Sequence, residues 1–549
     1  MPWELEINII DVGQGESSLI IARNPATGAV RSLLIDGGLA TYAQTVHNYV
    51  VARGLLNGPD QILVTHYDVD HTGGIQALLI ADNLYRVSDM IATVAANRAL
   101  GLGAPNARPD QAVAAAAAAY AVALGGYNDP NGVDCSAQVA LAVTATHLNY
   151  GIWTDANAVK DALKLVVRSL SGPFNPMLIP GPMKIGEVAA AAGIAAAAAI
   201  AAGGNVVAST RTAIFDSLRS TVQEGSRFST GGIYRNAHII DIGNTNHIGV
   251  RYTDAVAGRY LSSGNQPVQA VGTNRVRRGP IALGTEILWN RGPNAAPAPV
   301  NSPAVFIVAR LKRAWNGPNA STPFVGPQPD NADSIGLIVR FNRFFYYTGA
   351  DLPYQGDEPI ATAVTAYGLP DPQGAVGATF APAVRIACFK CGHHGANSST
   401  SQNFLNTADP AGAVISCGRN QFGRGDNHPM QPLIDRLVGY APLGYFYLTN
   451  CKYATNHIPA SQGLVNQLGV VGNKSRVAGV NDDNVVSAET DIISPRQRGN
   501  IRVSLNQDES DSPYNMGPLP FGAVLRQFHV RYFEEDGNVN NFRIENVTF

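Results

Sequence analysis

Charged residues are scarce in this chain, and what it lacks excludes several classes of protein. Only 15% of its 549 residues are charged and the formal net charge is −2, whereas a typical soluble domain is about 25% charged. Such a near balance gives no overall electrostatic attraction to nucleic acid or to a membrane surface. Any contact with nucleic acid must therefore come from a local patch. The length allows one elaborated domain or roughly two to three ordinary ones.

Cysteine is also scarce, and long apolar runs are missing. The chain has five cysteines, an odd number, which argues against a disulfide framework and predicts a cytoplasmic protein. The N-terminus has no basic segment followed by an apolar one, so we expect no signal peptide. The most apolar stretch, Val188 to Ala202, is mostly alanine. It is shorter than the roughly 20 residues that span a bilayer, so we expect no membrane contact.

One short segment carries four potential metal ligands, His66, Asp68, Asp70 and His71, and continues as Thr-Gly-Gly. It directly follows residues 61–65, an apolar run that is typical of a buried parallel strand. In α/β folds the chemistry lies at the carboxyl ends of such strands. Histidine nitrogen together with carboxylate oxygen suits zinc, manganese or iron better than calcium or magnesium alone. The segment therefore predicts a metal site. The alternative, an ordinary polar loop, accounts poorly for this spacing.

Residues of the same kind follow three more expected strands. Asp36 ends a strand before two glycines, Asp351 follows the apolar run that ends at Thr348, and His393 and His394 follow a strand that ends near residue 389. Strand ends are where α/β folds place their chemistry, so these residues are further candidates for the site that contains the segment 66–71.

The spacing of these residues resembles a known metal motif. His66-x-Asp68-x-Asp70-His71 is similar to the motif of the metallo-β-lactamase superfamily. Aspartate at the third position, where histidine is usual, resembles the ComEC-type branch, the nuclease domain of a competence DNA-uptake protein. Other stretches similar to that branch are Asp-Val-Gly-Gln-Gly at 11–15, Asp-Gly-Gly at 36–38, Gly-His-His-Gly at 392–395 and His-Pro at 428–429. The resemblance covers about residues 5–80 and 280–450.

The resemblance implies an α/β fold, a metallo-β-lactamase-like αββα sandwich with a large insertion. The expected core is residues 1–84 and 276–460. Residues 85–275 include alanine-rich runs, which favour helix, so we expect a mostly helical lobe near the mouth of the site. That lobe would serve as a lid, as a substrate selector, or as a surface for a homo-oligomer or partner protein. Residues 461–549 alternate like strands and are expected to extend the core.

Roles for the metal ligands also follow from the resemblance. His66 and Asp68 would hold one divalent cation, Asp70 and His71 a second, and Asp351 would bridge the two, with zinc or manganese as the metal. Asp70 and Asp351 would thereby take part in catalysis.

The two adjacent histidines leave two assignments open. His393 is the preferred remaining ligand, with His394 as a proton donor or phosphate contact, and the reverse assignment is the alternative. The residues expected to orient ligands are Asp36, Ser399 and His428. The residues expected to contact phosphate are Lys390, Arg419 and Arg424, which fit solvated surface charges equally well.

One feature of the resembled family is missing. Its members carry a histidine before the strand that begins near residue 335, whereas the matching segment here, Ile287 to Pro293, contains none. This leaves open a weakly held first metal, a substitute ligand from Asn290 or from a histidine of the insertion, or a single-metal or inactive site.

These observations predict a metal-dependent hydrolase that cleaves phosphodiester bonds, as a nuclease on DNA or RNA. Two other functions remain open. One is a phosphodiesterase for small molecules, such as a cyclic nucleotide or a phosphocholine ester. The other is a non-catalytic binding or assembly protein with a degenerate metal site.

Overall fold

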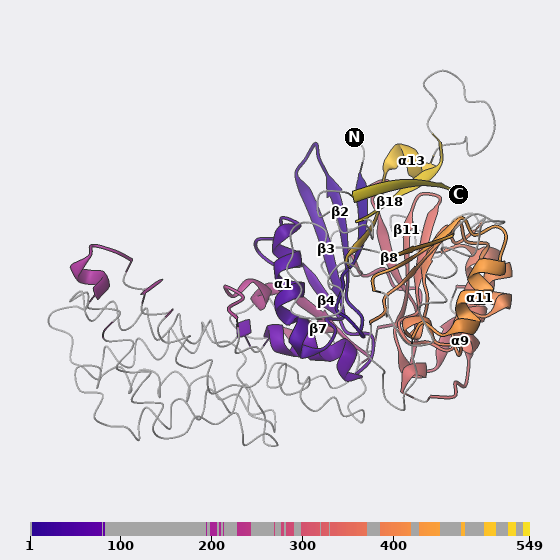
Figure 1. The fold of residues 1–549 in the computed structure, drawn as a ribbon, viewed down its shortest axis with the longest axis horizontal. Helices are drawn as coiled ribbons and strands as arrows, with labels where there is room; N and C mark the ends of the chain where they lie inside the picture. Colours follow the sequence, from indigo (N-terminus) through magenta and orange to yellow (C-terminus); the bar gives the residue numbers. More distant parts are fainter. Residues whose placement is uncertain are drawn as a thin grey trace.

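The computed structural model describes two large sheets, together with scattered parts of the region 85–275. The described residues are 3–79, 81–82, 194, 198–205, 208–209, 212, 228–242, 268–269, 276–278, 281–289, 298–318, 320–328, 330–369, 385–418, 428–450, 474–477, 499–511, 525–533 and 542–549. Within them the fold is mixed α/β with two large sheets (Figure 1).

The first sheet is antiparallel on one side and parallel on the other. Its strand order is β19-β18-β17-β1-β2-β3-β4-β5-β7-β6. Pairing is antiparallel from β19 to β3 and parallel from β3 through β4 and β5 to β7. The strands are β1 Glu4–Ile9, β2 Ser18–Asn24, β3 Ala29–Ile35, β4 Gln61–Leu63, β5 His238–Ile240, β6 Val268–Gln269, β7 Val276–Arg278, β17 Ile501–Asn506, β18 Gln527–Phe533 and β19 Phe542–Thr548.

The second sheet has the same division into antiparallel and parallel halves. Its order is β10-β9-β8-β11-β12-β13-β14-β15-β16, and pairing is parallel from β12 to β16. The strands are β8 Ala304–Arg310, β9 Arg313–Trp315, β10 Ser321–Pro323, β11 Gly336–Phe341, β12 Phe344–Thr348, β13 Cys388–Lys390, β14 Gly412–Ile415, β15 Tyr445–Leu448 and β16 Ser475–Val477.

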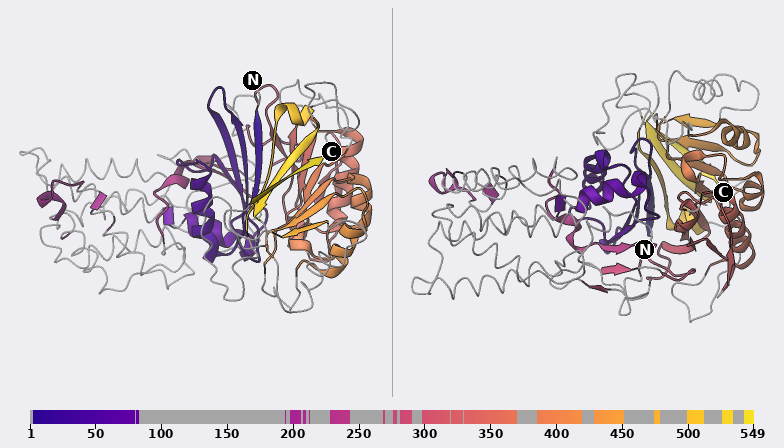
Figure 2. Two further views of the ribbon diagram at one scale, coloured as in Figure 1. Left: turned by 45° about the horizontal axis from the view of Figure 1, so that its top comes forward. Right: turned by 90° about the horizontal axis from the view of Figure 1, so that it is seen from below.

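Helices lie on the outer faces of the two sheets. Figures 1 and 2 show α1 outside the first sheet and α9 and α11 outside the second. The helices are α1 Ala43–Ala52, α9 Tyr354–Tyr367, α10 Gln402–Ala408, α11 Gln431–Gly439 and α13 Gln507–Asp511, with short 3-10 turns η1 Ala40–Tyr42, η3 Ile233–Asn236, η4 Asn331–Asp333 and η5 His393–Gly395. Among the described residues, no helix has both the length and the apolar character needed to cross a membrane.

Alternating side chains build the two cores. On β11, Leu337 and Val339 face the first sheet, whereas Ile338 faces the helices; β12 repeats this with Phe344 inward and Phe345 outward. This is the period of two expected of a strand that is covered on both faces. Each such buried side chain contributes about 1.5–3 kcal/mol, so the sheets are held firmly against each other where the site forms.

Two expectations from the sequence need adjustment. The helix after the metal segment begins at residue 69, not near 75, so Asp70 and His71 lie in its first turn. In addition, β5 falls within the region 85–275, which was expected to be a helical lobe, yet it pairs in parallel with β4 and belongs to the first sheet. Most of that region lies outside the described residues, so its helical character and its place near the site stay predictions.

Candidate metal centre

The first group of site residues lies where β4 leaves the first sheet. β4 ends at Leu63 and His66 follows shortly after it. The backbone carbonyl of Asp68 accepts the N–H groups of His71 (3.1 Å) and Thr72 (2.9 Å), which begins the next helix. Since the turn is tight, one histidine precedes the helix and an aspartate–histidine pair stands in its first turn.

The second group comes from the second sheet. Asp351 follows β12 through Ala350, whose φ of 51° is left-handed, a backbone state uncommon for residues other than glycine. The N–H of His393 donates to the carbonyl of Ala350 at 2.8 Å, which joins this turn to the turn that follows β13. The Ser399 hydroxyl donates to the carbonyl that precedes His393 at 2.6 Å. These bonds fix how Asp351, His393 and His394 are presented.

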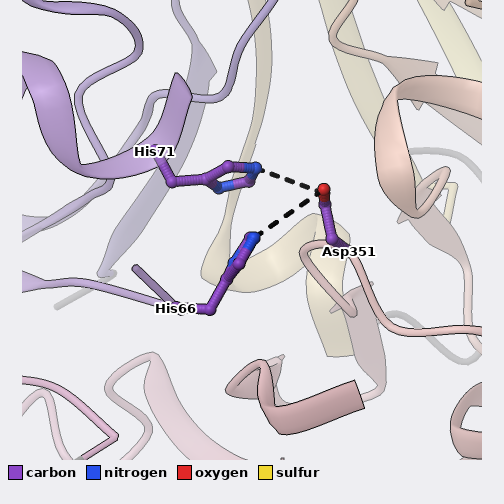
Figure 3. A group of neighbouring side chains, drawn as sticks. All are labelled: His66, His71 and Asp351. Atoms are coloured by element: carbon purple, nitrogen blue, oxygen red, sulfur yellow. Dashed lines mark ion pairs between the residues drawn. The ribbon is translucent and has the colours of Figure 1, made fainter. Parts of the chain in front are cut away.

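Asp351 of the second sheet points toward His66 and His71 of the first (Figure 3), and His394 of its own sheet also lies close to it. Its Oδ1 is 3.3 Å from Nε2 of His71 and 3.7 Å from Nε2 of His394, and its Oδ2 is 3.8 Å from Nε2 of His66. Asp70 Oδ2 is 3.2 Å from Nε2 of His394. All five side chains are buried. The structure therefore brings together five of the predicted site residues in one buried group, three from one sheet and two from the other.

Hydrogen bonds on the far sides of the rings turn the histidines toward Asp351. Asp36 Oδ2 accepts the Nδ1–H of His71 at 2.7 Å and the hydroxyl of Thr65 at 2.6 Å. The oxygen of that hydroxyl lies 3.1 Å from Nδ1 of His66 and, having given its proton to Asp36, can accept from it. Both rings thus carry their protons on Nδ1 and present bare Nε2 atoms to the centre.

His394 is held in the same way by the second sheet. Its Nδ1 lies 3.1 Å from the backbone carbonyl of Ser416, which can only accept a hydrogen bond. The proton therefore sits on Nδ1, and Nε2 faces Asp70 and Asp351.

The buried atoms that face the centre have no hydrogen-bond partner among the described residues. They are Nε2 of His66, His71 and His394, Oδ1 of Asp70 and Oδ1 of Asp351. Leaving so many buried polar atoms unpaired is costly, whereas they form a suitable donor set for a divalent cation. Two overlapping sets lie close enough to share an ion, namely His66, His71 and Asp351, and Asp70, His71 and His394. The residues present fit the metal that the motif implies.

The electrostatics of the metal-free centre favour a positive charge on His71, and a bound cation would take the place of that proton. Burial lowers the pKa of His71, but Asp351 and Asp36 outweigh burial and raise it well above its ordinary value. Burial raises the pKa of Asp351, but His71 and the neighbouring histidines hold it well below its ordinary value. The pKa of Asp70 is also lowered: burial acts to raise it, and His394 and His71 outweigh burial. The carboxylates thus stay charged and need positive charge beside them.

His393 lies on the solvent-facing side of the group. Its side chain is 14% exposed, and its Nε2 is 3.8 Å from Asp351 Oδ2 and 3.3 Å from the amide nitrogen of Asn331. The ring of His428 lies 5.2 Å from that of His393. Asp68 is also at the rim, 43% exposed, with Oδ2 3.6 Å from Nε2 of His66. Of the two adjacent histidines, the geometry therefore puts His394, and not His393, inside the buried group.

Of the three residues expected to contact phosphate, the structure describes Lys390. Lys390 is completely buried and its ammonium group lies 2.6 Å from the Glu16 carboxylate. The prediction that Lys390 contacts substrate is therefore corrected, because its charge is already paired away from solvent. Arg419 and Arg424 lie outside the described residues, as does Asn290, a suggested substitute ligand.

Thr65, Ser416 and Asn331 contact the site histidines, yet the sequence analysis gave none of them a role. Thr65 directly precedes His66, so its position was a signal. Ser416 contacts His394 through its backbone carbonyl, which no side-chain pattern reveals.

Comparison with known protein families finds a match in the N-terminal part of the chain. A family model described as the metallo-β-lactamase superfamily matches residues 12–127, which include the segment 66–71. That superfamily is generally hydrolytic and generally uses divalent metals, so the match indicates a metal-dependent hydrolase. No curated protein matches the sequence.

Proposed function

We propose that the protein hydrolyses phosphodiester bonds with a pair of divalent cations, and that its substrate is nucleic acid. The single observation that carries the cation pair is the position of Asp351, whose two carboxylate oxygens face different histidines. Oδ1 faces His71 and His394, and Oδ2 faces His66. A carboxylate in this position can bridge two ions, which is the arrangement of many two-metal phosphodiesterases.

The ligands divide between the two cations. His66, Asp68 and Oδ2 of Asp351 would hold one ion. The other ion would be held by Asp70, His71 and His394 together with Oδ1 of Asp351. This assignment takes the alternative for the histidine pair, with His394 as ligand, because its Nε2 is buried and bare. We propose zinc or manganese, which accept this mixture of nitrogen and oxygen.

The first of these sites is the weaker one. It has one buried histidine and one half-exposed carboxylate, Asp68, apart from the shared Asp351. The segment that lacks the family histidine begins at Ile287, and the structure describes it as far as Trp289. The ring centroid of Trp289 lies 5.2 Å from that of Trp3.

The protein's own groups orient the reactants. Bound divalent cations would supply an activated water at neutral pH and would neutralise negative charge on a phosphate. Asp36 and Thr65 keep the Nε2 atoms of His71 and His66 available for binding. His393 is placed to exchange a proton with substrate, because it lies beside Asp351 on the exposed side.

The proposal of nucleic acid rests on the resemblance to the ComEC-type branch. His393 adds local support: it lies beside Asp351, with Asn331 and His428 next to it, and its ring can donate a hydrogen bond to a phosphate oxygen. Such a titratable donor suits a chain with no general positive charge.

An activity screen tests the proposal. The purified protein, supplied with Mn²⁺ or Zn²⁺, is assayed on linear DNA, on RNA and on an aryl phosphodiester, with the double variant Asp70→Asn/His71→Ala as control. We expect cleavage of a nucleic acid by the wild type and none by the control. Cleavage of the aryl ester alone would favour a small-molecule phosphodiesterase. No cleavage of any substrate would favour a binding protein with a degenerate site.

A further inference from the structure

The buried ion pair between Glu16 and Lys390 joins the two sheets directly beneath the candidate metal centre. Glu16 lies in the turn between β1 and β2 of the first sheet, and Lys390 is the last residue of β13 in the second. The Lys390 ammonium lies 2.6 Å from Oε2 of Glu16, and neither side chain is exposed. Burying two charges costs free energy. We therefore ask what the ion pair does between the two sheets.

The turn that carries Glu16 is also hydrogen-bonded to residues of both sheets, Asp70 on one side and Ser416 on the other. The backbone N–H of Glu16 donates to the carbonyl of Asp70 at 3.1 Å. The carbonyl of Gly15 accepts the hydroxyl of Ser416 at 2.9 Å, and the carbonyl of Ser416 in turn lies 3.1 Å from Nδ1 of His394. One turn is therefore linked to Asp70 on one side of the centre and to His394 on the other.

The turn at Gly15 and Glu16 packs closely against its neighbours. A Cβ atom on Gly15 would lie 2.7 Å from the backbone oxygen of Asp70. The carboxylate of Glu16 also lies within 4.8 Å of the Asp36 carboxylate and of a ring nitrogen of His71. A shift of Glu16 would therefore also disturb Asp36, the residue that orients His71.

We propose that Gly15, Glu16, Lys390 and Ser416 form a clasp that sets the distance between Asp70 and His394, and so the affinity of the site for metal. These are positioning residues, since they are proposed to act through Asp70 and His394. The inference rests on the proposed metal site but not on the substrate. It explains why Lys390, next to the motif that carries His393 and His394, is turned inward.

Charge and geometry can be separated by a paired substitution. Lys390→Met alone leaves the Glu16 charge buried and unpaired, which threatens the fold. The double variant Glu16→Gln/Lys390→Met removes one charge of each sign, so the net charge around the centre does not change. A loss of metal affinity in this variant reports altered positioning and not altered electrostatic attraction.

The test measures Mn²⁺ affinity by competition with a chelator, on protein shown to be folded by circular dichroism. For the double variant we expect affinity to fall about 10-fold or more, the range seen for groups that orient ligands. The matched control is Arg53→Met/Glu6→Gln, which removes an ion pair of 2.8 Å between the end of α1 and β1. Its Mn²⁺ affinity should match that of the wild type. An unchanged affinity in the clasp variant, or an equal loss in the control, would overturn the inference.

A gentler variant keeps the test decisive if the double variant does not fold. Ser416→Ala removes only the hydroxyl that donates to Gly15, and it should weaken Mn²⁺ binding about threefold or more because a single hydrogen bond is lost. No change in this variant would count against the clasp. Wild-type protein that binds Mn²⁺ but cleaves no phosphodiester would refute the proposed reaction alone, whereas wild-type protein with affinity for neither Mn²⁺ nor Zn²⁺ would refute both.

Discussion

Asp36 offers a sharp test of how the metal site is held, because it touches the ligands without facing the centre. It accepts three hydrogen bonds: Oδ1 from the Thr65 N–H at 2.9 Å, and Oδ2 from the Thr65 hydroxyl at 2.6 Å and from His71 at 2.7 Å. In Asp36→Asn the amide group must face at least one of these donors, whichever way it is turned. If it faces His71, the ring must move its proton to Nε2, where it blocks metal binding.

The expected loss follows from these bonds. Orienting groups of this kind change metal affinity by about 10–100-fold, which corresponds to about 1.4–2.8 kcal/mol. Metal affinity is measured by chelator competition, and the stability of the metal-free protein by denaturant unfolding. Stability should fall by about 1.5–3 kcal/mol, the contribution of a hydrogen bond to a charged group.

Asp60 provides a matched control for Asp36. Its Oδ2 accepts the backbone N–H of Ser32 at 3.0 Å and the hydroxyl of Ser32 at 3.1 Å, the same pattern that Thr65 presents to Asp36. Asp60→Asn should lower stability without changing metal affinity. The reasoning fails if Asp36→Asn binds metal within twofold of wild type, or if Asp60→Asn loses as much affinity.

Two further predictions concern the histidine pair and the pH dependence of stability. His394→Ala should lose bound metal, whereas His393→Ala should keep its metal and turn over roughly 10²–10⁴-fold more slowly, as expected for a lost proton transfer. Metal analysis and initial rates distinguish the two variants. Equal metal loss in both would contradict the assignment. Burial raises the pKa of Asp357 to about 7, although the Tyr347 hydroxyl donates to it at 2.6 Å. Because the folded state holds this proton more tightly than the unfolded state, stability should fall as pH rises from about 4 to about 7. Asp357→Asn should remove that part of the slope in unfolding titrations, and an unchanged slope would show that Asp357 is not the group responsible.

The gathering of site residues at strand ends could be predicted from sequence. Apolar runs predict β4, β12 and β13, and the family resemblance implied that Asp70, Asp351 and the histidine pair, which follow these strands, belong to one metal site. The role of Asp36 as an orienting group was also a prediction, and its three hydrogen bonds agree with that role. A local pattern sufficed because these residues stand directly after strands.

Details that depend on distant partners could not be read from the sequence. Which histidine of the pair turns inward depends on two left-handed residues in succession, with φ of 47° for His393 and 51° for His394. Lys390 resembles a surface charge until Glu16, from the other sheet, is placed beside it. Strand β5 is short and flanked by a long alanine-rich region, so its pairing with β4 is set by tertiary packing and not by a pattern of its own.

The number and coupling of bound manganese ions test the central claim most directly. Wild-type protein is loaded with Mn²⁺, and its metal content and electron paramagnetic resonance spectrum are compared with those of Asp351→Ala. If Asp351 bridges a cation pair, the wild type should bind two Mn²⁺ per chain with a spin-coupled spectrum, and the variant should lose the coupling and at least one ion. Two coupled ions retained in Asp351→Ala, or a wild type that binds neither Mn²⁺ nor Zn²⁺, would contradict the account.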